Sequence, residues 1–243
     1  MVSAEELLGI FEKRPRRFKL LDKGIALLKV DENQTWLEIG CNNGDAISHL
    51  VDINKVKGIG VDYDSKAIKK ANIKFNKGIE FIECDARDLP IKDGSIDGII
   101  SEAAFSPIDN KEKLAKEYYR VLKKGGYVVV NDFIIRNKTT HNEREEYAYI
   151  PCFAGVETLD DYEQNFKNAG LKVYYKQEVY AELISIVTWL SKSLNISIKD
   201  VGTVLSSYYH GDNASYCTSK FNSNGLLNKA LLSYGQIILI KEK

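Results

Sequence analysis

The stretch that decides the fold of this chain is Leu37-Glu38-Ile39-Gly40-Cys41-Asn42-Asn43-Gly44. It ends an apolar run that begins at Thr35, and a segment with helical spacing follows from Asp45. Glycines between a strand and a helix let a ligand approach bare backbone, because they carry no Cβ and reach positive φ at low cost. The stretch therefore predicts a strand, a tight turn and a helix that form one side of a binding site.

A second apolar run, Gly58-Ile-Gly-Val61, follows and ends in the acid Asp62. An acid at that place in a βαβ unit accepts hydrogen bonds from both hydroxyls of a ribose. The glycine turn alone is weak evidence, but the turn and the acid together predict a nucleoside site. The spacing Gly40-x-x-x-Gly44 lacks the third glycine of the dinucleotide fingerprint G-x-G-x-x-G, which disfavours an NAD-linked oxidoreductase.

Four segments resemble, in order, motifs of the class I S-adenosylmethionine (SAM) methyltransferases of the methyltransferase type 11 kind. The glycine turn led by Glu38 resembles motif I, (D/E)-x-G-x-G-x-G, and Val61-Asp-Tyr-Asp64 looks like the ribose-binding strand end. Phe81–Pro90 looks like the adenine-binding turn, and Glu117–Asp132 is similar to the E-x-x-R-V-L-K-P-G-G passage into the fifth strand. The resemblance covers roughly residues 30–180.

The alternation of strand and helix patterns predicts an α/β fold with a doubly wound, Rossmann-like sheet. Strands are expected near 35–39, 57–62, 79–85, 96–101, 127–133, 171–179 and 234–241, and helices near 3–11, 17–29, 45–52, 65–76, 109–122 and from Thr158 to Gly170. The resemblance implies seven strands with the last one antiparallel. Residues 1–180 and 234–243 would form the methyltransferase domain.

Residues 181–233 form a long insertion between the sixth and seventh expected strands. Two stretches in it, 181–193 and 198–209, carry helical apolar spacing. The sixth strand should end at the carboxyl edge of the sheet, where open α/β sheets bind their ligands. We therefore expect a helical, lid-like insertion that is not an independent domain. A homodimer interface is the alternative role.

The resemblance implies SAM as cofactor and S-adenosylhomocysteine (SAH) as product. It implies the following cofactor-binding roles: Gly40 and Gly44 shape the turn, which also contains Cys41 and Asn42; Glu38 braces the turn and meets the methionine ammonium; Asp62 accepts the ribose hydroxyls; Tyr63 and the Ala86 backbone flank the adenine; Asp85 accepts from the adenine amino group; the Ser101 carbonyl addresses the ammonium. The side chains of Cys41 and Cys84 are expected to be small buried fillers.

Asn42 stands where the family has its middle glycine. Asparagine is enriched in the left-handed backbone region, so the turn can still form. The alternative interpretation is a decayed site that no longer binds SAM. Because Gly40, Gly44, Asp62 and Asp85 all remain, we favour a working site.

The acceptor side is less clear from the sequence. Asp132 ends the fifth expected strand and His210 lies in the insertion, and these two are the candidates for catalysis. Glu102, Cys152 and Cys217 are the candidates for contact with the substrate. Each also has a structural interpretation: the acids as helix caps or ion-pair partners, the histidine as a solvated side chain, and the cysteines as small hydrophobes. No metal ligand set is expected.

Two passages are similar to the branch that holds the arsenite and quinone C-methyltransferases. One is the stretch from Ser101 to Leu114, and the other is Pro151-Cys152-Phe-Ala-Gly155, which matches the Cys-x-x-Gly of the arsenite enzymes. The chain lacks their Cys-rich tail, which disfavours arsenic itself as the acceptor. It also lacks the Asn/Asp-Pro-Pro-Tyr of amino-nitrogen nucleic-acid methyltransferases after the fourth strand, which disfavours base methylation.

Composition agrees with an enzyme acting on a small molecule. The 243 residues include 34 basic and 34 acidic side chains, so the chain lacks the basic excess typical of nucleic-acid-binding proteins. No apolar run reaches about 18 residues, so no membrane span is expected. The four cysteines form no CxxC pair, which suits the reducing cytoplasm. A protein or RNA methyltransferase and a non-catalytic SAM-binding protein are the alternatives.

Overall fold

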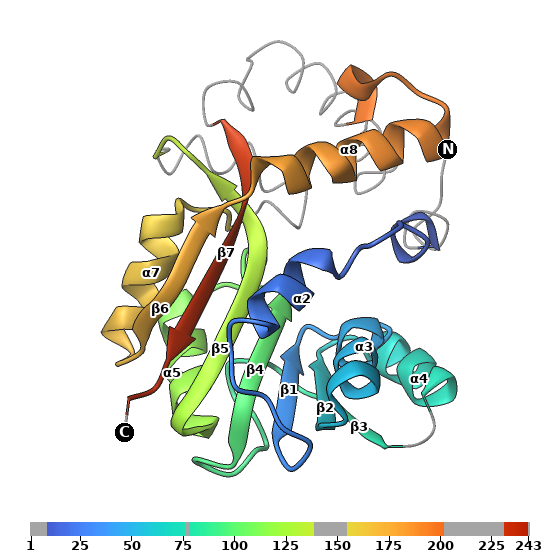
Figure 1. The fold of residues 1–243 in the computed structure, drawn as a ribbon. Coiled ribbons are helices and arrows are strands. Elements are labelled where there is room, and N and C mark those ends of the chain that lie inside the picture. The colour runs from blue at the N-terminus through green and yellow to red at the C-terminus, as the bar shows by residue number, and fades with distance from the viewer. Residues whose placement is uncertain (1–8, 76–77, 139–154, 202–230, 243) are drawn as a thin grey trace.

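The computed structural model describes residues 9–75, 78–138, 155–201 and 231–242 (Figure 1). A seven-stranded sheet forms the middle layer, and helices cover both of its faces. The strands are β1 (Thr35–Ile39), β2 (Lys57–Asp62), β3 (Ile79–Glu83), β4 (Ile96–Glu102), β5 (Leu122–Ile135), β6 (Lys172–Glu178) and β7 (Leu232–Ile240). The helices are α2 (Lys19–Ile25), α3 (Asp45–Asn54), α4 (Ser65–Lys74), α5 (Lys111–Val121), α7 (Leu159–Asn168), α8 (Tyr180–Leu194) and the short 3-10 helix η2 (Ile198–Asp200).

The strand order is β3-β2-β1-β4-β5-β7-β6. Strand β7 is antiparallel to both of its neighbours, β5 and β6, and the other neighbouring strands pair in parallel. The predicted doubly wound sheet with an antiparallel last strand is thereby confirmed. The direction of strand succession reverses between β1 and β4, and ligands of open α/β sheets bind beyond the carboxyl ends at such a switch point.

Each face of the sheet carries its own hydrophobic core. Helices α2 and α3 contribute Leu21 and Ile47 to one core, and α5 and α7 contribute Leu114 and Phe166 to the other. The central strands are buried on both faces, as expected for parallel strands between helices. Gly98 in β4 shows how close this packing is, because a Cβ there would lie 2.4 Å from the ring of Trp36.

Most element boundaries agree with the sequence expectations, and two differ clearly. Strand β5 begins at Leu122 rather than near 127, because Leu122 already pairs with Ile96 before a register shift. Helix α2 is shorter than the expected 17–29. Of the expected helix 3–11, only residues 9–11 are described, and they are helical.

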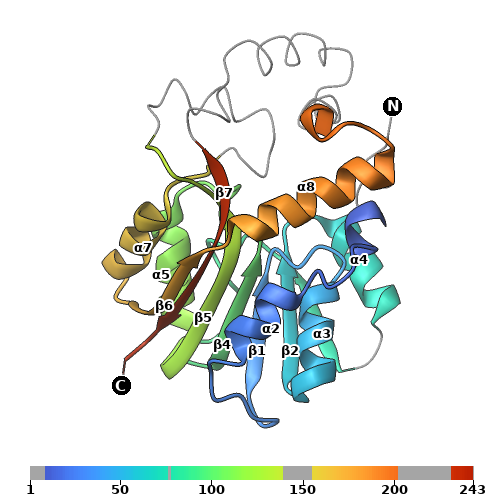
Figure 2. The same cartoon turned by 45° about the horizontal axis from the view of Figure 1, so that its top comes forward.

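The first helix of the insertion forms as its apolar spacing predicts. Helix α8 buries Leu183, Ile186 and Leu190 against Leu20 and Tyr234. Figures 1 and 2 both show this helix crossing above the carboxyl ends of the strands. The second expected helix, 198–209, is described only from η2 to residue 201, and its remainder lies outside the described residues.

Candidate functional site

The turn after β1 has the backbone that its sequence predicts. Gly40, Asn42 and Gly44 have φ values of 70°, 45° and 78°, all in the left-handed region. The expectation that Asn42 can take the place of a glycine is therefore confirmed for the backbone. The amides of Gly40 and Cys41 both donate to the Val61 carbonyl at 2.9 Å, which ties the turn to the end of β2.

Both glycines are needed for space as well as for conformation. A Cβ on Gly40 would lie 2.4 Å from the Cβ of Ala104, and one on Gly44 would lie 2.5 Å from the ring of Phe81. Real Cβ atoms do not come so close to other atoms. The turn is thus packed between the loop after β4 and strand β3.

Glu38 connects the end of β1 to the first turn of α3. Its carboxylate accepts a hydrogen bond from the Ile47 amide at 2.8 Å, in the first turn of α3. The N-cap of helix α3 is Gly44, which has no side chain to cap the helix, so Glu38 provides the acceptor that a capping side chain would supply. Burial raises the pKa of Glu38 well above its usual value, although the Ile47 hydrogen bond opposes this shift.

Asp62 lies beside the turn at the carboxyl end of β2. Its Oδ2 accepts from the Asn42 amide at 2.9 Å, and its Oδ1 accepts from the Asp64 amide at 3.0 Å. Each carboxylate oxygen can accept more than one hydrogen bond, so acceptor capacity remains for ribose hydroxyls. Tyr63, the next residue, is 84% exposed and offers a bare aromatic face at this edge.

Asp85 is held by an ion pair at the end of β3. The Arg87 guanidinium donates to both carboxylate oxygens, with Nη2 to Oδ2 at 2.7 Å, and the Arg87 amide donates to Oδ1 at 2.8 Å. These hydrogen bonds from Arg87 lower the pKa of Asp85 to about 2. Sequence reasoning missed this partner, and the role of Asp85 toward an adenine amino group stays a prediction.

Glu102 occupies the end of β4, next to the buried Ser101. Its Oε1 accepts from the Asn131 side-chain amide at 2.5 Å. Burial raises the pKa of Glu102 to about 8, and the negative charges of Asp132 and Glu182 add to the shift. A carboxyl group that titrates near neutral pH at the ligand-binding edge is a candidate for proton transfer.

A buried polar network fixes the orientation of Asn131. Gln236 on β7 donates from Nε2 to Asn131 Oδ1 at 2.9 Å and to the Leu20 carbonyl at 2.9 Å. Because Oδ1 of Asn131 is thus an acceptor, its Nδ2 faces Glu102 as a donor. Sequence reasoning missed Asn131 and Gln236. The only signal for them was a single amide residue inside each of two apolar strands.

Asp132 is buried and surrounded by donors. Its Oδ2 accepts from the Phe105 and Ser106 amides, both at 2.8 Å, and its Oδ1 accepts from the Ser106 hydroxyl at 2.8 Å and from the Phe133 amide at 2.7 Å. Burial raises the pKa of Asp132 to about 6, against the effect of these hydrogen bonds. The carboxylate therefore faces the loop after β4, and its catalytic assignment stays a prediction.

The N-terminal segment, residues 9–18, lies between the glycine turn and α8. Four contacts hold it there: Glu12 with the Asn43 side chain, Arg17 with Asp45 at 2.7 Å, Arg14 with Glu182 at 2.6 Å, and the Trp189 indole N–H with the Ile10 carbonyl at 2.8 Å. Arg14 and Arg17 belong to the basic stretch Lys13-Arg14-Pro15-Arg16-Arg17, and both pair with acids of the chain itself.

The remaining candidates divide into described and undescribed residues. His210, Cys152 and Cys217 lie outside the described residues. Cys41 and Cys84 are free thiols, and burial raises the pKa of both, that of Cys84 to about 11, which agrees with a role as small fillers. Within residues 9–75, 78–138, 155–201 and 231–242, no group of three His, Cys, Asp or Glu side chains is arranged to hold a metal ion. No helix in that part of the chain is both long and apolar enough to span a bilayer.

The chain is similar to known methyltransferases. A family model described as "Methyltransferase domain" matches residues 37–130. The ubiquinone/menaquinone biosynthesis C-methyltransferase UbiE of Campylobacter jejuni is 32% identical over 56% of this chain and 69% of its own length. The 27-O-demethylrifamycin SV methyltransferase of Amycolatopsis mediterranei is 24% identical over 66% of this chain and 62% of its own length.

A solved structure with a similar fold is that of a putative sarcosine dimethylglycine methyltransferase from Galdieria sulphuraria. It has a TM-score of 0.73 and 19% identity, covering 93% of this chain and 86% of that one. For several curated relatives, the matched part of the chain spans only 38–62% of their length.

The chain belongs to the family of SAM-dependent methyltransferases, and the cofactor of this family is SAM. The resemblance to the branch of the quinone and arsenite enzymes is also confirmed, since proteins of both names are among the matched relatives. The glycine turn, Asp62 and the carboxyl edge of the sheet lie within or beside the segment that the family model matches.

Proposed function

We propose that this chain transfers a methyl group from SAM to a small-molecule acceptor. The observation that carries the proposal is the contact of the Asp62 carboxylate with the Asn42 amide, which joins the ribose-binding acid to the glycine turn. In the transfer, a lone pair of the acceptor attacks the methyl carbon and the bond from that carbon to the sulfonium sulfur breaks. SAH then leaves with a neutral sulfur.

On the acceptor side, we assign proton transfer to Glu102 rather than to Asp132. One oxygen of Glu102 is oriented by Asn131, and its pKa of about 8 is suited to accepting a proton from an acceptor hydroxyl or acidic carbon. Asp132 already accepts four hydrogen bonds, three of them from the loop residues 105 and 106, so its role is to hold that loop. Cys152, Cys217 and His210 remain further candidates on this side.

The test begins with the cofactor. Calorimetry should show that the purified chain binds SAM and SAH, and mass spectrometry should then detect a gain of one methyl group in a panel of quinones, phenols, amines and thiols. A methyl gain on RNA or on a protein, with none on the small molecules, would mean that the chain is a protein or RNA methyltransferase. Binding of SAM with no methyl gain on any acceptor would favour a non-catalytic SAM-binding protein.

We further propose that α8 serves as part of a lid over the site and that the protein works in the cytoplasm. The Arg14–Glu182 ion pair and the Trp189–Ile10 hydrogen bond connect α8 to the segment beside the glycine turn. The free thiols of Cys41 and Cys84 suit a reducing compartment.

Amide hydrogen exchange in α8 is expected to slow when SAH is bound, because lids come from the less stable parts of a fold and gain contacts on closure. The measurement is exchange followed by mass spectrometry, with and without SAH, at two protein concentrations. Protection that depends on protein concentration and not on SAH would mean that α8 is a homodimer interface instead.

A second prediction concerns the pH dependence of stability. Because the folded-state pKa of Glu102 is raised to about 8, its contribution to stability is fully present below the ordinary glutamate value and is lost as pH rises through 8. Glu102→Gln cannot ionise and still accepts from Asn131. The variant should therefore unfold like the unmodified protein at pH 4 but be more stable at pH 9, by about 5 kcal/mol, because the pKa shift from 4.5 to about 8 counts in full above both values.

Chemical denaturation at both pH values measures this difference. Glu112→Gln is the control, since Glu112 is exposed on α5 and its pKa is lowered by Lys116 rather than raised. Parallel stability curves for Glu102→Gln and the unmodified protein would mean that Glu102 ionises normally and has no special proton affinity.

A further inference from the structure

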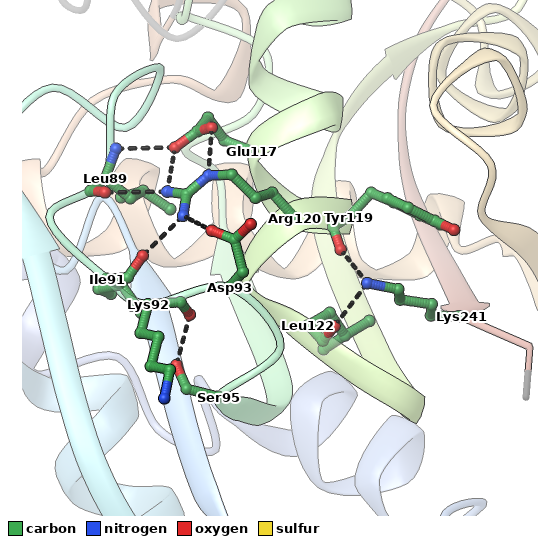
Figure 3. Close-up of polar contacts among 10 residues, drawn as sticks. All are labelled: Leu89, Ile91, Lys92, Asp93, Ser95, Glu117, Tyr119, Arg120, Leu122 and Lys241. Atoms are coloured by element: carbon green, nitrogen blue, oxygen red, sulfur yellow. Dashed lines mark hydrogen bonds and ion pairs between the residues drawn. The ribbon is translucent and has the colours of Figure 1, made fainter.

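The side chains of Glu117 and Arg120 form a compact ion pair on α5, shown in Figure 3. Arg120 donates from Nε and Nη2 to the two oxygens of Glu117, both at 2.7 Å. This fork-to-fork arrangement is the strong geometry of an arginine–carboxylate pair, and a lysine cannot reproduce it. The pair is partly buried, with 29% of the Arg120 side chain and 15% of the Glu117 side chain exposed.

The same two side chains also hold the loop between β3 and β4. Glu117 accepts from the Leu89 amide at 2.8 Å, and Arg120 donates to the Leu89 carbonyl at 2.9 Å. Arg120 further donates to the Ile91 carbonyl at 2.7 Å and to Asp93 at 2.6 Å. The pair thus binds both backbone polar groups of Leu89, as a neighbouring β-strand would.

Leu89 directly follows the turn that begins at Asp85. The Asp88 amide donates to the Asp85 carbonyl at 2.9 Å, and the Cys84 amide donates to the Asp62 carbonyl at 2.9 Å. The turn is therefore fixed at one end by β2 and at the other by Glu117 and Arg120. Residues 84–95 contain no helix or strand, so anchors of this kind are what limits the conformational freedom of the loop.

We propose that Glu117 and Arg120 are positioning residues that set the Asp85–Ala86 turn for the adenine of the cofactor. The inference rests on the proposed function, because it takes SAM as the ligand of the site. Neither residue touches the adenine itself. They fix the turn by holding Leu89, and the turn then presents the Asp85 carboxylate and the Ala86 backbone to the base.

The alternative is that Glu117 and Arg120 only stabilise the fold. The relative affinity for SAH and S-inosylhomocysteine distinguishes this role from positioning of the turn. S-inosylhomocysteine differs from SAH by an oxo group in place of the adenine amino group and by a proton on N1. The donor that would face Asp85 at position 6 thus becomes an acceptor, and N1 can no longer accept a hydrogen bond from the Ala86 backbone. The unmodified protein should bind SAH at least about tenfold more tightly than S-inosylhomocysteine, as expected for one charge-assisted hydrogen bond. A displaced turn loses this preference even when the protein is fully folded.

The experiment compares three variants by calorimetry well below their unfolding temperatures. Arg120→Lys should raise the Kd of SAH about tenfold and reduce its preference over S-inosylhomocysteine to less than about threefold. Glu117→Gln should do the same to a smaller degree, and it serves if Arg120→Lys does not fold. Lys116→Ala removes the exposed Glu112–Lys116 pair of the same helix, which does not contact the loop, and should change neither value.

The inference is overturned if both Arg120→Lys and Glu117→Gln bind SAH with unchanged affinity and preference while their unfolding temperatures fall. It is also overturned if the unmodified protein binds SAH without any preference over S-inosylhomocysteine. Failure of the unmodified protein to bind SAH at all would instead remove the proposed function, on which the inference rests.

Discussion

Replacing Asp62 by alanine is expected to weaken binding of both SAM and SAH roughly tenfold to hundredfold, which corresponds to about 1.5–3 kcal/mol. Two effects add in this substitution. The proposed acceptor of the ribose hydroxyls is removed, and the Asn42 amide loses the oxygen that holds the glycine turn at 2.9 Å. Calorimetry with SAH measures the loss directly, without any need to know the methyl acceptor.

The matched control is Asp64→Ala. Asp64 lies two residues further along and accepts from the Lys66 amide as the N-cap of α4. Its loss should cost about 1 kcal/mol of stability, as for other N-caps, and leave SAH affinity unchanged. If Asp62→Ala binds SAH as tightly as the unmodified protein, Asp62 is not part of the site and the proposed function loses its main support.

The sequence predicted the cofactor half of the fold because its signals are local. A glycine turn and a strand that ends in an acid each involve residues close together in the chain. The structure confirms the left-handed Asn42 and the strand boundaries of β1 and β2. Physical constraints on short segments are enough to fix these features.

The contacts that sequence reasoning missed are long-range. Asn131 and Gln236 bond across β5 and β7 although they are 105 residues apart, and their pairing depends on the register of an antiparallel strand from the far end of the chain. The contact of Arg14 with Glu182 spans an even longer distance in sequence. In the sequence, such a hydrogen-bonded pair shows only as a single polar residue in each apolar strand. This local signal does not identify the partner.

The acceptor side could be predicted only in part for the same reason. Glu102 and Asp132 are both acids at a strand end, so their positions in the sequence do not separate a proton acceptor from a loop anchor. Their surroundings separate them, since the Asp132 carboxylate accepts three hydrogen bonds from residues 105 and 106, whereas that of Glu102 receives one from Asn131.

Gly40→Ala is expected to abolish measurable SAH binding, with a Kd increase of at least about hundredfold. The new methyl group would lie 2.4 Å from the Cβ of Ala104, and the φ of 70° is itself unfavourable for alanine. Ala104 cannot simply retreat, because Asp132 fixes the next two residues of its loop. Overpacking of this kind costs about 1–3 kcal/mol, and backbone strain adds about 1–2 kcal/mol.

Gly78→Ala separates the two contributions to this loss. Gly78 also has a positive φ, of 84°, but a Cβ there meets no described atom within 4 Å. The residue directly precedes β3, so it lies at the amino end of that strand, away from the carboxyl edge where the site lies. The Gly78→Ala variant should therefore lose only the stability that backbone strain costs, about 1–2 kcal/mol, and keep its SAH affinity. Thermal unfolding and calorimetry on both variants give the comparison. Normal SAH affinity in Gly40→Ala would show that the cofactor does not depend on the turn after β1, because the substitution must move either that turn or the loop that carries Ala104.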